Sequence, residues 1–166
     1  MEIGAIVDQL NILDGYYKEL IEVANRKTRI IIENDIDQLM RCTQTEKSLM
    51  KQITDAENQL LEHSYAFIQS KGIRSQLKLT VTELSKLVFD PDQRQRLRAA
   101  QVQLDATLRQ MKELNDHNQQ LLDQSLQFVN FRLDLMIEYP DEGVVYKRPD
   151  QDHRSVWTSG QLDTRA

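Results

Sequence analysis

Glycine, proline, cysteine and aromatic residues are all scarce in this chain. Its 166 residues include five glycines, three prolines and one cysteine, and aromatic residues make up 6%. Because glycine and proline punctuate turns, their scarcity excludes a domain built from many short strands and favours long helices. One cysteine, Cys42, excludes an internal disulfide bond, which suits a reducing compartment.

Long apolar runs and excess positive charge are also lacking. No stretch approaches the roughly 18 apolar residues that a membrane span requires. The start, Met1-Glu2-Ile3-Gly4, does not have the basic and then apolar pattern of a secretory signal. The formal net charge is -5, which argues weakly against nucleic acid, whose binders carry a basic face. We therefore expect a soluble, cytoplasmic protein that neither binds nucleic acid nor inserts into a membrane.

Heptad-like apolar spacing predicts two long helices in the first half of the chain. The first ends at Asn34-Asp35, which are good capping residues, and its seam alternates in steps of three and four. The second runs to Ser70, with Gly72 placed as its C-terminal cap. Spacing leaves its seam ambiguous at three points, which are Cys42 or Thr43, Leu49 or Met50, and Phe67 or Ile68. The first seam consists of Ile3, Ile6, Leu10, Leu13, Tyr17, Leu20 and Ala24.

A short helix and a third long one are predicted in the second half. Thr80 and Glu83 have the spacing of a capping box, and Asp90-Pro91 can start a helix that runs to about Glu138. Its predicted seam includes Leu97, Leu104, Leu108 and Met111.

The composition changes after Tyr139-Pro140. The segment 139–166 holds two of the three prolines and the only tryptophan, Trp157, and shows no helical period. We expect residues 1–138 to form a helical domain and residues 139–166 to form a flexible polar tail.

No residue pattern in the chain indicates catalysis or a cofactor. A di-metal site in a bundle needs Glu-x-x-His pairs, and neither His63 nor His117 has one; His153 follows Asp150 at a similar spacing, but in the polar tail. Glycine-rich phosphate loops are absent. Cys42 is predicted to be a buried, inert thiol. We therefore expect no enzyme activity, no metal and no cofactor.

Two features leave alternatives open. Arg94, Arg96 and Arg98 form either a solvated patch or a docking site for an acidic partner. Asn118 and Ser125 sit seven residues apart in the last apolar seam, where buried polar groups fix register. They set the register either within the fold or towards a second helix that comes and goes.

The C-terminal half of the last helix has more apolar residues than one seam uses. Such an excess marks a binding surface when it is exposed, and a groove for an amphipathic partner helix is the mode that it favours. The residues are Leu121, Leu122, Leu126, Phe128, Val129, Phe131, Leu133, Leu135, Met136 and Ile137.

These patterns resemble the FlgN family of flagellar type III export chaperones. The first helix contains Leu13-x-x-Tyr16-Tyr17-x-x-Leu20, followed by Lys27 and by Ile31-Ile32-x-Asn34-Asp35-x-x-x-Leu39. The last helix contains Leu114-Asn115-x-x-Asn118-x-x-Leu121-Leu122-x-x-Ser125-Leu126, and Tyr139-x-x-x-Gly143 follows it. The likeness covers residues 3 to 143. Pro140, where the family often has glycine, and the segment after Gly143 depart from it.

The resemblance implies an all-α fold, an antiparallel bundle of three long helices plus one short helix. It also implies a cytoplasmic chaperone that binds the C-terminal region of the hook–filament junction proteins FlgK and FlgL. Tyr139 would dock on the cytoplasmic domain of an export-gate membrane protein. The implied client-binding residues are Asn118, Leu121, Leu122, Ser125, Leu126, Val129, Leu133 and Met136.

Two other functions fit an all-helical chain. The first is a homo-oligomeric coiled-coil bundle with a structural or signalling role and no client. The second, more distant, is a metal-dependent bundle enzyme. An oligomer that persists on dilution distinguishes the first, and metal analysis distinguishes the second.

Overall fold

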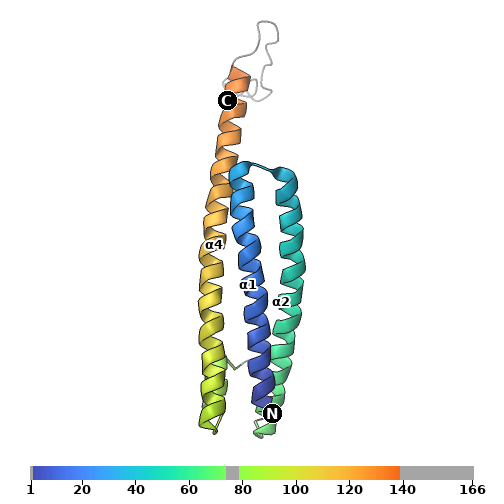
Figure 1. Cartoon of the computed structure of the whole chain (residues 1–166), viewed down its shortest axis with the longest axis vertical. Coiled ribbons are helices and arrows are strands. Elements are labelled where there is room, and N and C mark those ends of the chain that lie inside the picture. The colour runs from blue at the N-terminus through green and yellow to red at the C-terminus, as the bar shows by residue number, and fades with distance from the viewer. Residues whose placement is uncertain (1, 74–78, 139–166) are drawn as a thin grey trace, which may run out of the picture. The chain divides into compact units, whose positions relative to one another are not determined.

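The computed structural model describes residues 2–73 and 79–138, and these residues form three long helices and one short helix (Figure 1). The helices are α1 (Glu2–Glu33), α2 (Ile36–Ser70), α3 (Val81–Lys86) and α4 (Pro91–Glu138). No strand occurs within the described ranges. The predicted all-helical fold, with each long helix antiparallel to the one before it in the chain, is confirmed. Trp157 and the rest of the predicted tail lie outside the described residues.

The chain divides into two units, Met1–Leu126 and Gln127–Ala166. The first unit contains α1, α2, α3 and most of α4. In it, α2 runs antiparallel to α1, since Gln9 pairs with Ala56 and Lys27 pairs with Glu46. The described part of the second unit is the continuation of α4 to Glu138.

The direction and register of α4 follow from two buried polar contacts with α1. Thr107 contacts Asp14, 93 positions earlier, and Asn118 contacts Ala24, 94 positions earlier. Because both positions increase together, α4 runs parallel to α1. At an offset of 93, the last residue of α1, Glu33, is matched by Leu126. Within the first unit, α1 therefore offers α4 a partner only up to that point.

Two hydrophobic clusters form the core of the first unit. One joins all four helices and includes Ile6 of α1, Ile68 of α2, Leu84 of α3 and Leu97 of α4, each no more than 1% exposed. Burial of such a side chain contributes on the order of 1.5–3 kcal/mol. The second cluster lies further along α1, from Leu13 onwards, and is made mainly by α1 and α2. Its buried members are Leu13, Leu20, Val23, Cys42, Leu49, Ile53 and Ala56.

Two residues in the left-handed conformation end α1 and α2. Asn34 has φ 57° and Gly72 has φ 76°, a region that asparagine and glycine tolerate best. In each case the amide of the residue after the left-handed one bonds back across the turn, from Asp35 to the Ile30 carbonyl and from Ile73 to the Ile68 carbonyl. These bonds satisfy carbonyls that the helix end leaves free. Asp35 then caps α2 by accepting the Gln38 amide.

The predicted capping box of α3 is confirmed. Thr80 accepts the Glu83 amide at 3.3 Å, and the Glu83 carboxylate accepts the Thr80 amide at 2.7 Å. These backbone and side-chain hydrogen bonds from Thr80 lower the pKa of the Glu83 carboxyl. The short helix is thereby set with Leu84 and Val88 in the first hydrophobic cluster.

Candidate protein-binding site

Exposed apolar side chains concentrate at the C-terminal end of α4. Of the sixteen large hydrophobic residues that are exposed in the described part of the chain, eight lie between Leu126 and Ile137. Val129 is 44% exposed, Leu133 51% and Met136 67%. Because exposed apolar side chains are unfavourable in water, this section is the strongest candidate for a partner surface. The eight are Leu126, Phe128, Val129, Phe131, Leu133, Leu135, Met136 and Ile137.

The predicted client-binding residues differ in exposure along α4. Leu121, Leu122 and Ser125 are half-buried, whereas those from Leu126 onwards are exposed. Tyr139 lies outside the described residues. Four exposed apolar residues, Phe128, Phe131, Leu135 and Ile137, were absent from the predicted contact set, although the same apolar excess indicated them.

Asn118 is 2% exposed and bonds to α1. Its Nδ2 donates to the Ala24 carbonyl at 2.9 Å, and its Oδ1 accepts the Thr28 hydroxyl at 2.6 Å. Both polar ends of the amide are therefore used within the first unit, as the register-setting interpretation of this residue requires. Ser125, one heptad further on, makes no such contact among the hydrogen bonds of the described residues.

The apolar seam of α4 differs from the predicted one at Leu108. Thr107 is 4% exposed and donates a hydrogen bond to Asp14, whereas Leu108 is 38% exposed. The prediction placed Leu108 in the seam because leucine is hydrophobic. A threonine can be buried there instead when its hydroxyl forms a hydrogen bond with a buried carboxylate. Burial opposes ionisation of Asp14, yet hydrogen bonds from Lys18 and Thr107 and the charge of Lys18 outweigh it and lower its pKa.

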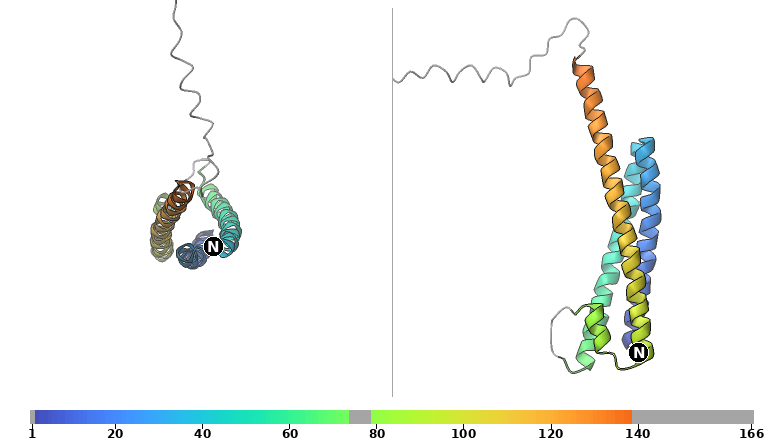
Figure 2. Two further views of the ribbon diagram at one scale, coloured as in Figure 1. Left: turned by 90° about the horizontal axis from the view of Figure 1, so that it is seen from above. Right: turned by 90° about the vertical axis from the view of Figure 1, so that its left-hand side faces the viewer.

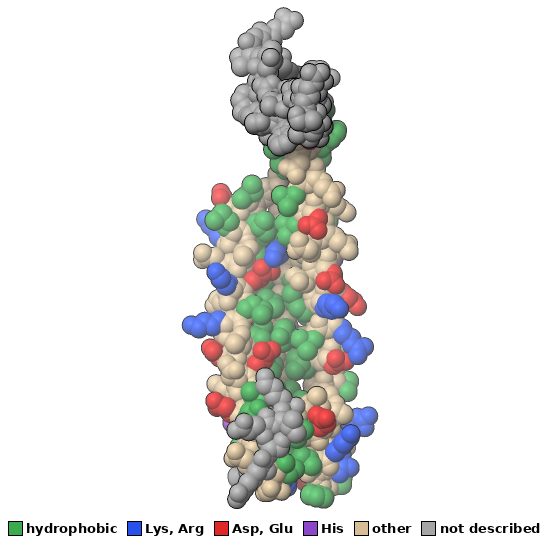
Figure 3. All heavy atoms as spheres, turned by 180° about the vertical axis from the view of Figure 1, so that it is seen from behind, with side chains coloured by type: hydrophobic (Ala, Val, Ile, Leu, Met, Phe, Trp, Pro, Cys, Tyr) green, Lys and Arg blue, Asp and Glu red, His purple; other side chains and the backbone are tan. Residues whose placement is uncertain are grey.

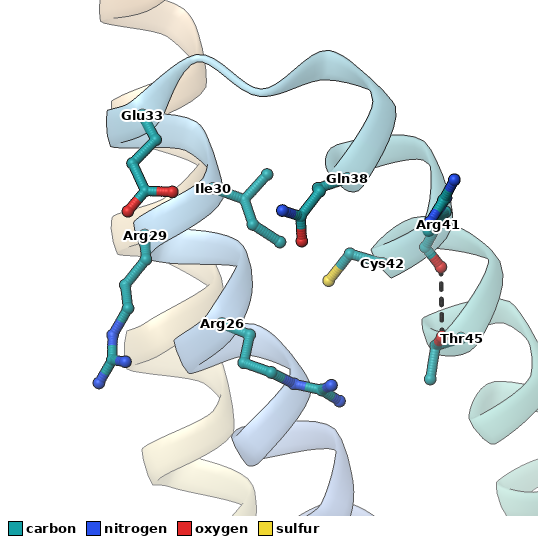
Figure 4. Close-up of a pocket in the computed structure, with 8 residues that line it drawn as sticks. All are labelled: Arg26, Arg29, Ile30, Glu33, Gln38, Arg41, Cys42 and Thr45. Carbon is teal, nitrogen blue, oxygen red and sulfur yellow. Dashed lines mark hydrogen bonds between the residues drawn. The ribbon is translucent and has the colours of Figure 1, made fainter.

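A pocket of about 290 Å³ lies beside the turn between α1 and α2. Figure 4 shows that the guanidinium groups of Arg26, Arg29 and Arg41 point in different directions and do not converge on one point. The Cys42 thiol lies in this pocket and contacts the Val23 carbonyl at 3.6 Å. Burial, together with the negative charge of Glu46, raises the pKa of that thiol. The thiol is therefore protonated at neutral pH, as predicted for an inert residue.

The arginine cluster near the start of α4 is partly used by the fold. Arg94 donates two hydrogen bonds to the Val88 carbonyl, at 2.6 and 3.1 Å, and so joins the end of α3 to α4. Arg96 and Arg98 are exposed. Within residues 2–73 and 79–138, no group of three or more metal-ligating side chains comes together.

No helix among the described residues combines the length and hydrophobicity that crossing a membrane requires. The fold and its exposed residues define a helical bundle whose longest helix offers an apolar surface to a partner. The sequence model of the FlgN family, described as FlgN protein, matches residues 1–154. The chain belongs to the FlgN family.

Membership of this family carries a role. FlgN proteins are non-enzymatic, cytoplasmic chaperones of flagellar protein export, and this chain is accordingly a flagellar export chaperone. The predicted family, the absence of enzyme activity and the coarse function are thereby confirmed. No curated protein and no solved structure matches the chain.

Proposed function

We propose that this chaperone binds the C-terminal region of the hook–filament junction proteins FlgK and FlgL and delivers them to the flagellar export gate. The observation that carries the proposal is the exposed apolar section of α4, from Leu126 to Ile137. A client helix with an apolar stripe would cover these residues and remove their apolar surface from water. The family supplies the class of client.

Three half-buried residues of the first unit are also assigned to client binding. Leu121, Leu122 and Ser125 lie on the preceding turns of the same helix. Asn118 forms the inner limit of the surface, because its amide is committed to α1. Docking to the cytoplasmic domain of an export-gate membrane protein is assigned to Tyr139, on the strength of the resemblance that the sequence shows there.

Replacing Val129 and Leu133 by Asp tests the client surface. Both side chains are substantially exposed, so the double variant is expected to keep its melting temperature within about 2 °C. Burying carboxylates against an apolar client costs several kcal/mol, so the affinity for a client C-terminal segment should fall by about 100-fold or more. Isothermal titration calorimetry and a melting curve measure the two quantities.

A matched control changes two exposed apolar residues elsewhere. Ile12 is 45% and Val102 62% exposed, and replacing both by Asp should leave client affinity unchanged. Equal loss of affinity in the control, or full affinity in the Val129→Asp/Leu133→Asp variant, would contradict the proposed surface. An oligomer of the unliganded chain that persists on dilution would favour a structural coiled coil instead.

A further inference from the structure

The helix α2 carries a second seam beside the one that packs against α1. At two of the points that spacing left ambiguous, the buried seam takes Cys42 and Leu49, which belong to the cluster with α1. Thr43 and Met50, the alternatives, are both exposed. They lie seven residues apart, so they share one face of the helix. Leu39 and Glu46 complete this second seam in steps of three and four, and the Glu46 carboxylate also accepts a hydrogen bond from Lys27 of α1 at 2.8 Å.

The helix α4 has a matching second seam in the first unit. Leu108, Asn115 and Leu122 follow one another at intervals of seven residues and therefore lie on one face. Met111, half-buried, lies between this face and the core. Leu122 is also one of the residues assigned to the client surface, so the two surfaces share a residue.

The two seams border a groove whose floor is α1. One hollow of about 420 Å³ is lined by Tyr17 and Leu20 of α1, by Met50 of α2 and by Leu108 and Met111 of α4. A second, more open hollow of about 960 Å³ lies along α2 and shares Glu46 and Met50 with the first. Figure 3 shows this side of the bundle, where hydrophobic side chains gather along the line between two helices and most charged groups stand at the edges.

At one end of the bundle this place is taken by α3. Leu84 packs in the same cluster as Ile68 of α2 and Leu97 of α4, and Gln101 of α4 donates to the Thr82 hydroxyl at 2.8 Å. Figure 2 shows the short helix α3 on the side of the bundle away from α1. Leu104 belongs to both hydrophobic clusters, and Leu108, one turn later, already lines the hollow. The helix α3 has only six residues, so it closes a four-helix arrangement only at that end.

We infer that an amphipathic helix of the client occupies this groove and completes a four-helix bundle beyond α3. The inference rests on the proposed function and names where the client helix lies. The helix α3 and the residues after it indicate what kind of helix fits the groove, because Leu84, Leu87 and Val88 present apolar groups at intervals of three and four. A client helix with the same spacing fits the continuation of the groove.

The lining of the groove favours a reversible partner over a permanent second copy. Of the five methionines of the chain, Met40, Met50 and Met111 line the hollows, and flexible methionine side chains adapt to different partner helices. Polar groups interrupt the apolar surface, whereas obligate interfaces are more uniformly hydrophobic. Lys47 and Lys112 stand at the edges and take part in none of the ion pairs of the described chain. They suit a client helix flanked by acidic residues.

The methionine methyl groups provide the test. The full chain is labelled with ¹³C-methyl methionine, the signals are assigned with Met→Leu variants, and a synthetic peptide of the C-terminal helical segment of a hook–filament junction protein is added. The inference predicts that the Met50 and Met111 signals shift together with that of Met136. It also predicts that Met50→Asp and Leu108→Asp each weaken peptide binding at least 10-fold, while Val102→Asp, exposed on the same α4 helix, does not.

The outcomes separate this inference from the proposed function. A peptide that binds, shifts Met136 and leaves Met50 and Met111 unmoved would overturn the groove and keep the client surface. Shifts of Met50 and Met111 on concentrating the chain without peptide would assign the groove to a second copy and also overturn the inference. A peptide that does not bind the unaltered chain would refute the proposed function itself, and the inference with it.

Discussion

Single polar residues inside the seams set the register of the long helices. The Asn118 amide is held by Ala24 and Thr28, the Asp14 carboxylate by Thr107, and Gln9 by the Ala56 carbonyl at 3.1 Å. Apolar seams of similar leucines and isoleucines would tolerate a slip by one heptad. A slip would leave these buried groups unpaired, at about 1–3 kcal/mol each, so the polar contacts exclude the alternatives.

Asp14 makes the stability of the bundle depend on pH. Its folded-state pKa lies below the ordinary value of 3.8, so its ionised form contributes stability above that pH, and the contribution is lost as the pH falls through the folded pKa. Replacing Asp14 by Asn should therefore destabilise the protein at pH 7, by about 1–3 kcal/mol, and by progressively less below about pH 4.

Urea unfolding of both proteins at pH 7 and pH 3 measures this difference. Asp105, which is 57% exposed and paired with Arg109, serves as the control. Its replacement by Asn should change the free energy of unfolding by less than about 1 kcal/mol at either pH, because surface ion pairs contribute little. A constant effect of Asp14→Asn across the pH range would show that its charge is not what stabilises the fold.

Two glycines with opposite roles give a second prediction at this scale. Gly15 lies inside α1, and a methyl group placed on it would meet no atom within 4 Å; it is a tolerated defect and does not allow close packing of helices. Gly15→Ala should raise the free energy of unfolding by about 0.5–1 kcal/mol. Replacing Gly72, which has φ 76°, by Ala should lower the free energy of unfolding by about 1–2 kcal/mol, because alanine is strained in that conformation. Thermal unfolding of the two variants measures both, and a shift of the same sign in each would contradict the account.

At the scale of elements, the sequence predicted where the helices begin and end. Asn34-Asp35, Gly72, the Thr80–Glu83 capping box and Asp90-Pro91 all mark boundaries in the structure. These signals are local, since each depends on the conformation of one residue or on a bond across one turn. Such local signals can therefore be recognised from the sequence alone.

The face that each helix buries was harder to predict. Cys42 and Thr43, or Leu49 and Met50, are neighbours about 100° apart on the helix, and both members of a pair fit a seam of three and four steps. On a helix with two apolar faces, spacing does not say which face meets α1. Thr107 was missed for a different reason: its partner, Asp14, is 93 residues away, and only the folded register brings the two together.

At the scale of the whole chain, α4 is longer than the helix α1 that it packs against in the first unit. The helix α1 has 32 residues and α4 has 48. In the parallel register, the last residue of α1 is matched by Leu126. The residues after Leu126 in α4 nevertheless keep an apolar composition, which natural sequences rarely retain on exposed surfaces without a partner. This excess could be read from the sequence; which of its residues are exposed required the fold.

The central claim is that a client covers the exposed section of α4, and hydrogen exchange tests it most directly. Amide exchange of the full chain is followed by mass spectrometry, with and without a saturating C-terminal segment of a hook–filament junction protein. The account predicts slower exchange for peptides from residues 126–138 and unchanged exchange at the end of α2 around Phe67 and Ile68, which are already buried. Client binding that leaves residues 126–138 unprotected, and protects another region instead, would contradict it.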